Sequence, residues 1–115
     1  MGKRLTRTER AAVARATAVA SAHFGVFRPL LSLPTRCKIR VTTARQVAMY
    51  LAHCSGQVPI GALTTAFGRD ASTINHDIKR IEDMRDEGSP FDAEMTYLER
   101  QFAEPVVRAK KARAA

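Results

Sequence analysis

Four polar side chains in the middle of the chain recur at helical spacing, and all four are of types that contact nucleic acids. They are Ser72, Asn75, His76 and Lys79, at positions i, i+3, i+4 and i+7. Asparagine can form two hydrogen bonds to adenine, serine can contact a base or a phosphate, and the methyl group of the adjacent Thr73 can pack on thymine. The pattern predicts one face of a helix that binds double-stranded DNA; the alternative is an ordinary solvated helix face.

The other side of this segment is apolar, which indicates that it is buried. It consists of one alanine and three isoleucines, namely Ala71, Ile74, Ile78 and Ile81. Asp70 is placed to cap the helix, which we expect to run to about Glu87. The N-terminal end should enter a DNA groove, because the C-terminal half carries acids that would repel DNA, namely Glu82, Asp83, Asp86 and Glu87.

A shorter helix is expected just before this one, because the apolar residues of segment 60–67 are spaced as on one helix face. Only residues 68–70 separate the two predicted helices, and the first of them is Gly68. Two helices joined by a short turn that contains glycine are typical of a helix-turn-helix, in which the second helix reads the DNA.

Two further segments before residue 60 have helical patterns. We expect an alanine-rich helix at residues 8–22 with Thr8 as its cap, followed by one short helical turn and a basic loop at 35–40. An amphipathic helix should begin at Thr43 and end near residues 55 and 56. A second face of that helix carries Arg45, Met49 and His53.

A last helix should begin at Ser89, a capping residue, and Pro90, which is favoured at the first helical position. Its apolar stripe is Phe91, Met95, Leu98 and Phe102. We interpret this helix as a lid on the core; the alternative is a surface for a protein partner. No segment has the pattern of a strand, so the expected fold class is all-α, a small helical bundle that contains a helix-turn-helix.

Charge is distributed unevenly along the 115 residues. The formal net charge is +8, but residues 1–45 carry +9, residues 46–104 carry −5 and residues 105–115 carry +4. Basic segments favour a polyanionic partner, because each neutralised phosphate releases counterions. We expect a domain at 12–103 between a basic N-terminal arm at 1–11 and a basic, disordered tail at 104–115.

The segments TTARQVAMYLA (42–52) and LTTAFGRDASTINHDIKRIED (63–83) resemble the C-terminal duplex-binding domain of the bacterial replication initiator DnaA. The hallmark of that domain is RQ(I/V)AMYL followed by an FGGRDHTTV-type turn and recognition helix. Upstream, AHFGVFRPLLS resembles the short helix before its basic loop, so the resemblance covers residues 12–103. It implies a DnaA-like fold in a cytoplasmic, nucleoid-associated bacterial protein.

The resemblance implies a phosphate contact by Arg45, an arginine of the basic loop in the minor groove, and reading of the major groove by segment 69–73. Together with the residue patterns described above, it predicts three kinds of DNA contact. Phosphates would be held by Thr43, Arg45, Arg69 and Lys79. An arginine of the basic loop would enter the minor groove; Arg36 is the candidate, with Lys38 and Arg40 as neighbours. The major groove would be read by the start of the recognition helix, through Asp70, Ala71, Ser72, Thr73, Asn75 and His76.

The sequence departs from the family pattern in ways that change the expected target. A single Gly68 replaces the paired glycine, and the absence of the base-reading imidazole at Ala71 removes a contact worth about 1–3 kcal/mol, so another DNA sequence should be preferred. His53 stands where the initiator uses a lysine, which should weaken phosphate binding. The chain has no GxxxxGK(S/T) loop and no room for an ATPase domain, so we expect a stand-alone reader.

These patterns predict a sequence-specific double-stranded DNA-binding protein that regulates transcription or replication. We expect no enzymatic activity, cofactor, metal, membrane or small-molecule substrate, because no catalytic or metal-ligand spacing and no membrane-length apolar run is present. The alternative from another class is a protein-binding adaptor that uses the last helix and makes only nonspecific DNA contacts. An RNA-binding protein is disfavoured by the lack of stacking aromatic residues.

Overall fold

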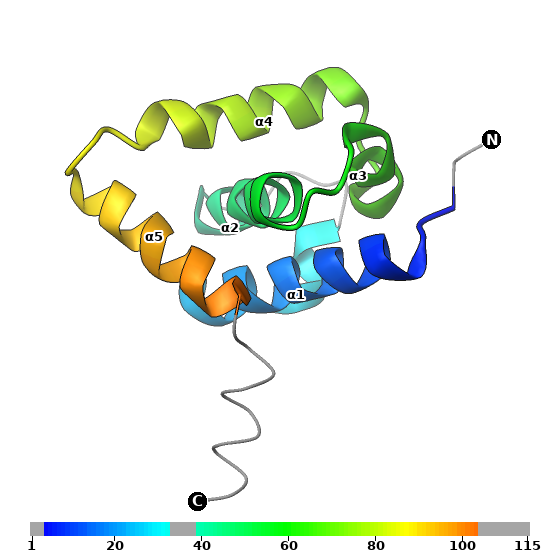
Figure 1. Ribbon diagram of the computed structural model, residues 1–115, viewed down its shortest axis with the longest axis horizontal. Coiled ribbons are helices and arrows are strands. Elements are labelled where there is room, and N and C mark those ends of the chain that lie inside the picture. Colours follow the sequence, from blue (N-terminus) through cyan, green and yellow to red (C-terminus); the bar gives the residue numbers. More distant parts are fainter. Residues whose placement is uncertain (1–3, 33–38, 104–115) are drawn as a thin grey trace, which may run out of the picture.

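The computed structural model describes residues 4–32 and 39–103, and no strand occurs in these ranges. The helices are α1 (Arg7–Phe24), the 3-10 helix η1 (Arg28–Ser32), α2 (Ile39–Tyr50), the π-helical turn η2 (Leu51–Ser55), α3 (Ile60–Phe67), α4 (Ala71–Met84) and α5 (Pro90–Ala103) (Figure 1). The expected all-α helical bundle is therefore confirmed. None of the described helices is long and apolar enough to cross a membrane.

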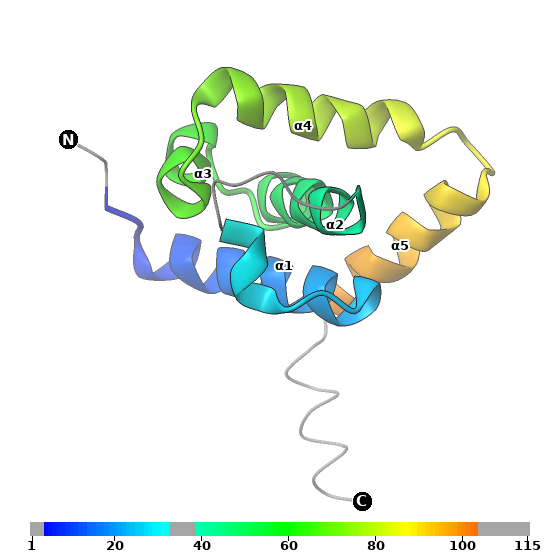
Figure 2. The ribbon, with the colours of Figure 1, turned by 180° about the vertical axis from the view of Figure 1, so that it is seen from behind.

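Helix α2 lies at the centre, with α1 on one side and α4 on the other (Figures 1 and 2). The expectation of an amphipathic helix was wrong, because the side chains of residues 44–50 are all buried. Met49, expected on an outer face, is fully buried, and Gln46 donates a hydrogen bond of 3.0 Å to Asp77 of α4. The C-terminal part of α2, residues 44–50, is thus covered on every side, and the other helices are arranged around it.

The start of α1 differs from its expected position. The cap is Thr6 and not Thr8: the Thr6 hydroxyl accepts a hydrogen bond from the Glu9 amide, and the Glu9 carboxylate accepts one from the Thr6 amide. This reciprocal capping box satisfies two otherwise unpaired amides, which explains why Thr6 is preferred. Residues 7–11, expected to belong to a basic arm, are therefore part of the helix.

The helix-turn-helix segment follows the predicted bounds closely. Helix α3 ends where Gly68 adopts a left-handed conformation (φ 64°), which glycine tolerates without strain. Asp70 then caps α4 as expected, but α4 ends at Met84, three residues before Glu87. Ile74, Ile78 and Ile81 are buried, each contributing about 2 kcal/mol, whereas Ala71 is exposed and does not belong to the buried stripe.

Helix α5 packs on the core, as expected of a lid, although Phe91 of its predicted stripe is only partly buried. The Ser89 hydroxyl accepts a hydrogen bond from the Asp92 amide, and Met95, Leu98 and Phe102 are buried. Phe102, near the C-terminal end of α5, lies close to Gly56. A Cβ atom added to Gly56 would lie 3.1 Å from the Phe102 ring and 2.7 Å from the Ala52 carbonyl oxygen. Only glycine fits this close approach.

Candidate nucleic-acid interface

The first three turns of α4 present a polar surface to solvent. Every predicted base-reading position on this helix is exposed, together with the predicted phosphate contact at its centre, namely Ala71, Ser72, Thr73, Asn75, His76 and Lys79. The buried isoleucines on the opposite side fix the rotation of the helix, so these side chains stay outward. The structure thus brings together the α4 portion of the predicted site.

The start of α4 is fixed by the carboxylate of Asp70. One of its oxygens accepts hydrogen bonds from the Thr73 amide (2.8 Å) and from the Ser72 hydroxyl (2.9 Å). The hydrogen bond from the Thr73 amide, followed by side-chain hydrogen bonds from Thr73 and Ser72, lowers the pKa of Asp70 below its ordinary value. A fixed negative charge at this helix end opposes a phosphate there but suits the amino group of cytosine.

Asn75 and Lys79 make weak local contacts that DNA can replace. The amide nitrogen of Asn75 donates a hydrogen bond of 3.0 Å to the Ala71 carbonyl, so a bidentate contact to adenine requires that the side chain rotate away. The Lys79 ammonium lies 3.7 Å from Asp83, and both side chains are largely exposed. An exposed pair of this kind contributes at most about 1 kcal/mol, which leaves Lys79 available for a phosphate.

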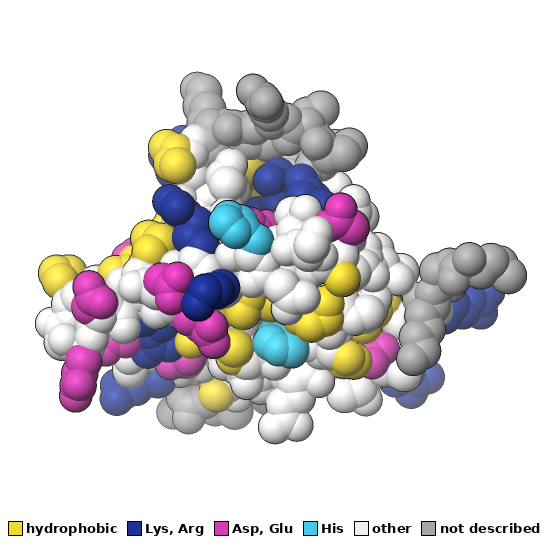
Figure 3. Space-filling model, turned by 90° about the horizontal axis from the view of Figure 1, so that it is seen from above, with side chains coloured by type: hydrophobic (Ala, Val, Ile, Leu, Met, Phe, Trp, Pro, Cys, Tyr) yellow, Lys and Arg dark blue, Asp and Glu magenta, His cyan; other side chains and the backbone are white. Residues whose placement is uncertain are grey.

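Exposed acidic side chains gather at the C-terminal end of α4. In the view from the α4 side, several Lys and Arg side chains and one histidine lie in the upper part of the surface, most acidic side chains lie to the left, and further basic side chains lie toward the lower left and the right edge (Figure 3). The acids of the C-terminal half and of the turn that follows it are exposed, namely Glu82, Asp83, Asp86 and Glu87. Residues 71–80 expose no acidic side chain, so an interface on this part of α4 avoids the repulsion that these acids would exert on DNA.

Two other predicted DNA-contacting arginines, Arg69 and Arg40, lie outside α4. One guanidinium nitrogen of Arg69 donates a hydrogen bond of 2.7 Å to the Phe67 carbonyl, which holds the partly exposed side chain at the end of α3. Arg40 is exposed in the first turn of α2, and Thr43, one turn later, is half-buried. Arg36 and Lys38, the expected minor-groove residues, lie outside the described residues.

Arg45 differs from the expectation of a phosphate contact. Its side chain is only 6% exposed, and its guanidinium donates hydrogen bonds to the carbonyl oxygens of Leu31 (2.9 Å) and Leu30 (3.2 Å). The buried guanidinium is therefore hydrogen-bonded to the end of η1 within the protein itself. In this structure Arg45 positions the end of η1, which leads into the basic segment.

His53 is also committed to the fold. Its Nδ1 atom lies 2.8 Å from the Val58 carbonyl oxygen, and the ring is half-buried. Because a carbonyl only accepts, Nδ1 must carry the proton, and the other nitrogen of the neutral ring is then an acceptor. The contact with Val58 holds the ring against the segment that leads into α3.

Sequence patterns missed one polar cluster that holds the far end of α4. The Arg85 guanidinium donates to Asp92 (2.7 Å), Glu99 (2.9 Å), Thr96 (3.2 Å) and the Tyr50 hydroxyl (3.3 Å). Burial lowers the pKa of Arg85, but hydrogen bonds to the two carboxylates more than offset this and raise it above its ordinary value. No local spacing in the sequence relates Arg85 to Tyr50, so only the tertiary fold reveals this cluster.

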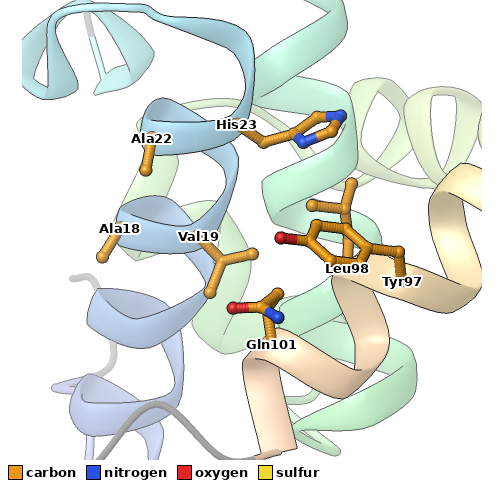
Figure 4. Close-up of a pocket in the computed structure, with 7 residues that line it drawn as sticks. All are labelled: Ala18, Val19, Ala22, His23, Tyr97, Leu98 and Gln101. Carbon is orange, nitrogen blue, oxygen red and sulfur yellow. The ribbon is translucent and has the colours of Figure 1, made fainter. Parts of the chain in front are cut away.

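A groove between α1 and α5 is the second distinctive surface (Figure 4). Apolar side chains of both helices line it, and His23 and Tyr97 stand at one end, where the His23 ring lies 2.6 Å from the Glu94 carboxylate. Tyr97 is 51% exposed. The described residues contain no group of three or more histidines, cysteines or acids placed to bind a metal ion.

Comparisons with models of known protein families, with curated proteins and with solved structures found no match to this chain.

Proposed function

We propose that this protein binds double-stranded DNA in a sequence-specific manner and regulates transcription or replication in a bacterial cytoplasm. The single observation that carries the proposal is the exposed polar face of α4, which follows a three-residue turn and includes Ser72, Asn75, His76 and Lys79. Its composition suits base edges and phosphates, and buried isoleucines hold it rigidly outward. The resemblance to the DnaA duplex-binding domain supports the same proposal.

In this proposal the start of α4 enters the major groove. Ser72, Thr73 and Asn75 contact bases, and Lys79 and Arg69 contact phosphates on either side. Because Ala71 has no hydrogen-bonding side chain, the preferred sequence differs from that of the initiator. Arg45 contributes indirectly, by holding η1 against α2.

The first test is selection of preferred sites from a random duplex library with the purified chain. Binding of the selected duplex and of a scrambled duplex is then measured at two salt concentrations. A preference of about 10³ or more supports the proposal. Weak binding without preference, lost at modest salt, contradicts it.

A variant pair assigns the preference to α4. Asn75→Ala should lower affinity for the selected duplex about tenfold or more while changing affinity for the scrambled duplex little. Arg100→Ala, which removes an exposed charge from α5, is the matched control and should retain the preference. Equal losses of Asn75→Ala on both duplexes would remove Asn75 from the base contacts.

The adaptor function is the second candidate, favoured by the apolar groove between α1 and α5 and its exposed Tyr97. Under this alternative, α5 binds a component of the replication or transcription machinery and DNA contact is nonspecific. Tyr97→Ala separates the two functions. Under either function this variant should bind DNA with unchanged affinity. It should abolish a regulatory effect in cells only if α5 binds a protein partner.

A further inference from the structure

A second groove lies on the opposite side of α1, between the N-terminal half of that helix, η1 and the end of α3. Figure 2 shows how these three elements are arranged. Its floor is apolar and includes Val13, Pro29 and Ala66. Two arginines, Arg10 and Arg28, stand among the residues that line it. The groove is therefore a basic surface with an apolar base.

The arginines of this groove are positioned by the main chain. Arg28 donates a hydrogen bond of 3.0 Å to the Ala14 carbonyl, and Arg10 donates a longer one, of 3.4 Å, to the Leu5 carbonyl. Arg7 precedes Arg10 by three positions on α1, so the two side chains are neighbours on the helix surface. We call Arg7, Arg10 and Arg28 the α1–η1 arginine cluster.

The charge of this cluster is not compensated within the described part of the chain. All three arginines are exposed, and none of them forms an ion pair there. The acid nearest to them in sequence is Glu9, and its carboxylate accepts a hydrogen bond from the Thr6 amide. Carbonyl partners orient the guanidinium groups without neutralising them, which leaves their positive charge for an anion.

The groove adjoins the elements that lead into the proposed DNA interface. Ser32 borders it and is the last residue of η1, directly before the basic segment. Ala66 also borders it and lies two residues before Gly68, where the turn into α4 begins. The groove therefore borders the end of α3, from which the turn leads into α4.

We propose that the α1–η1 arginine cluster binds the phosphate backbone of duplex DNA that flanks the sequence read by α4. This proposal rests on the proposed function and extends its footprint beyond the bases that α4 contacts. Arginines supply charge to successive phosphates, and the apolar floor can pack against deoxyribose. The contact is independent of sequence, so it adds affinity without adding preference.

The test compares two duplexes that carry the selected site. One is trimmed to the site, and the other places it centrally in about three helical turns, or about 30 base pairs. Arg7→Ala with Arg10→Ala changes exposed helical positions to the best helix former, which protects the fold. Arg28→Lys keeps a charge but loses the planar fork, and Arg100→Ala removes a charge on α5 as the matched control.

For the long duplex, the Arg7 and Arg10 double variant should lose affinity by about threefold to tenfold, with a salt slope smaller by about one to two. Arg28→Lys should show a smaller loss in the same direction. The trimmed duplex should bind all variants alike, and the preference for the selected site should persist. Thermal unfolding checks that each variant remains folded.

Two results would overturn this inference. If the cluster variants lose no more affinity for the long duplex than Arg100→Ala does, the cluster does not contact DNA. The groove would then be a candidate binding site for an acidic protein segment. Equal losses on trimmed and long duplexes would place the arginines within the site and not beside it. Absence of sequence preference in the wild-type chain is a different failure, because it contradicts the proposed function while the cluster variants still report on backbone contact.

Discussion

Arginines serve opposite purposes at the two ends of this molecule. At the end formed by α5 and the last turns of α4, Arg85 is only 16% exposed and is enclosed by the carboxylates of Asp92 and Glu99. At the end formed by η1 and the N-terminal half of α1, Arg10 and Arg28 are exposed and donate to carbonyl oxygens, which carry no net charge. At the α5 end, carboxylates neutralise the charge of Arg85 and link α4 to α5. At the η1 end, the carbonyl partners leave the charges of Arg10 and Arg28 in place.

This comparison indicates which charges are available for a ligand. A carboxylate partner lowers the attraction of a cation for phosphate, whereas a carbonyl partner fixes its direction and leaves its charge. The exposed acids near the end of α4, Asp83 and Glu87 among them, would in addition repel DNA at the Arg85 end. The difference in charge between the two ends of the molecule, and not the net charge of the chain, therefore indicates where DNA is expected to bind.

The largest effect is expected for the buried arginine between these ends. Arg45→Ala should lower the free energy of unfolding by about 3 kcal/mol, because the Leu30 and Leu31 carbonyls lose a buried donor. Urea unfolding measures this loss, and Arg45→Lys, which keeps one charged donor, should lose less. Unchanged stability together with a smaller salt slope of DNA binding would instead make Arg45 a direct phosphate contact.

The next largest loss of stability is expected for Arg85, at the end formed by α5 and the last turns of α4. Arg85→Met should lower the free energy of unfolding by about 1–2 kcal/mol, because Asp92 and Glu99 lose their partner but remain partly screened by solvent. DNA affinity, measured below the unfolding transition, should not change. A tenfold change in DNA affinity would contradict the division of the molecule into a structural and a DNA-binding end.

Local patterns were sufficient where one helix face decides the structure. The bounds of α3, the Asp70 cap, the isoleucine stripe of α4 and the Ser89 cap of α5 all depend on neighbours within a few positions. The same reasoning correctly placed the polar face of α4 in solvent. These features follow from helical periodicity and capping alone.

Other features depend on contacts between distant segments. Three features require that other elements cover α2: the burial of residues 44–50, the hydrogen bond between Gln46 and Asp77, and the role of Arg45. A polar residue on a predicted outer face carries no signal that a second helix will enclose it. The misplaced cap of α1 is different, because Thr6 and Glu9 have the capping-box spacing and could have been identified.

A smaller effect is expected for the phosphate contact at the centre of α4. Lys79→Ala should weaken binding of selected and scrambled duplexes alike, by a few-fold, and reduce the salt slope by about one. Stability should change by less than about 0.5 kcal/mol, because the pair with Asp83 is exposed. Asp83→Ala should have the opposite effect on affinity, since it removes a negative charge beside the interface; a loss of affinity in that variant would contradict this account.

The smallest effect is expected at the Asp70 cap, where it depends on pH. Because hydrogen bonds from Thr73 and Ser72 lower the pKa of Asp70 in the folded protein, the folded state binds this proton less readily than the unfolded chain does. The stabilisation is complete at neutral pH and is lost as pH falls through the lowered pKa, below about pH 4. The difference in Tm between wild type and Asp70→Ala should therefore shrink between pH 7 and about pH 3.

Asp70→Asn, a cap without a titrating group, should keep a pH-independent advantage over Asp70→Ala. A wild-type advantage of the same size at both pH values would show that the charge of Asp70 does not contribute to holding the start of α4.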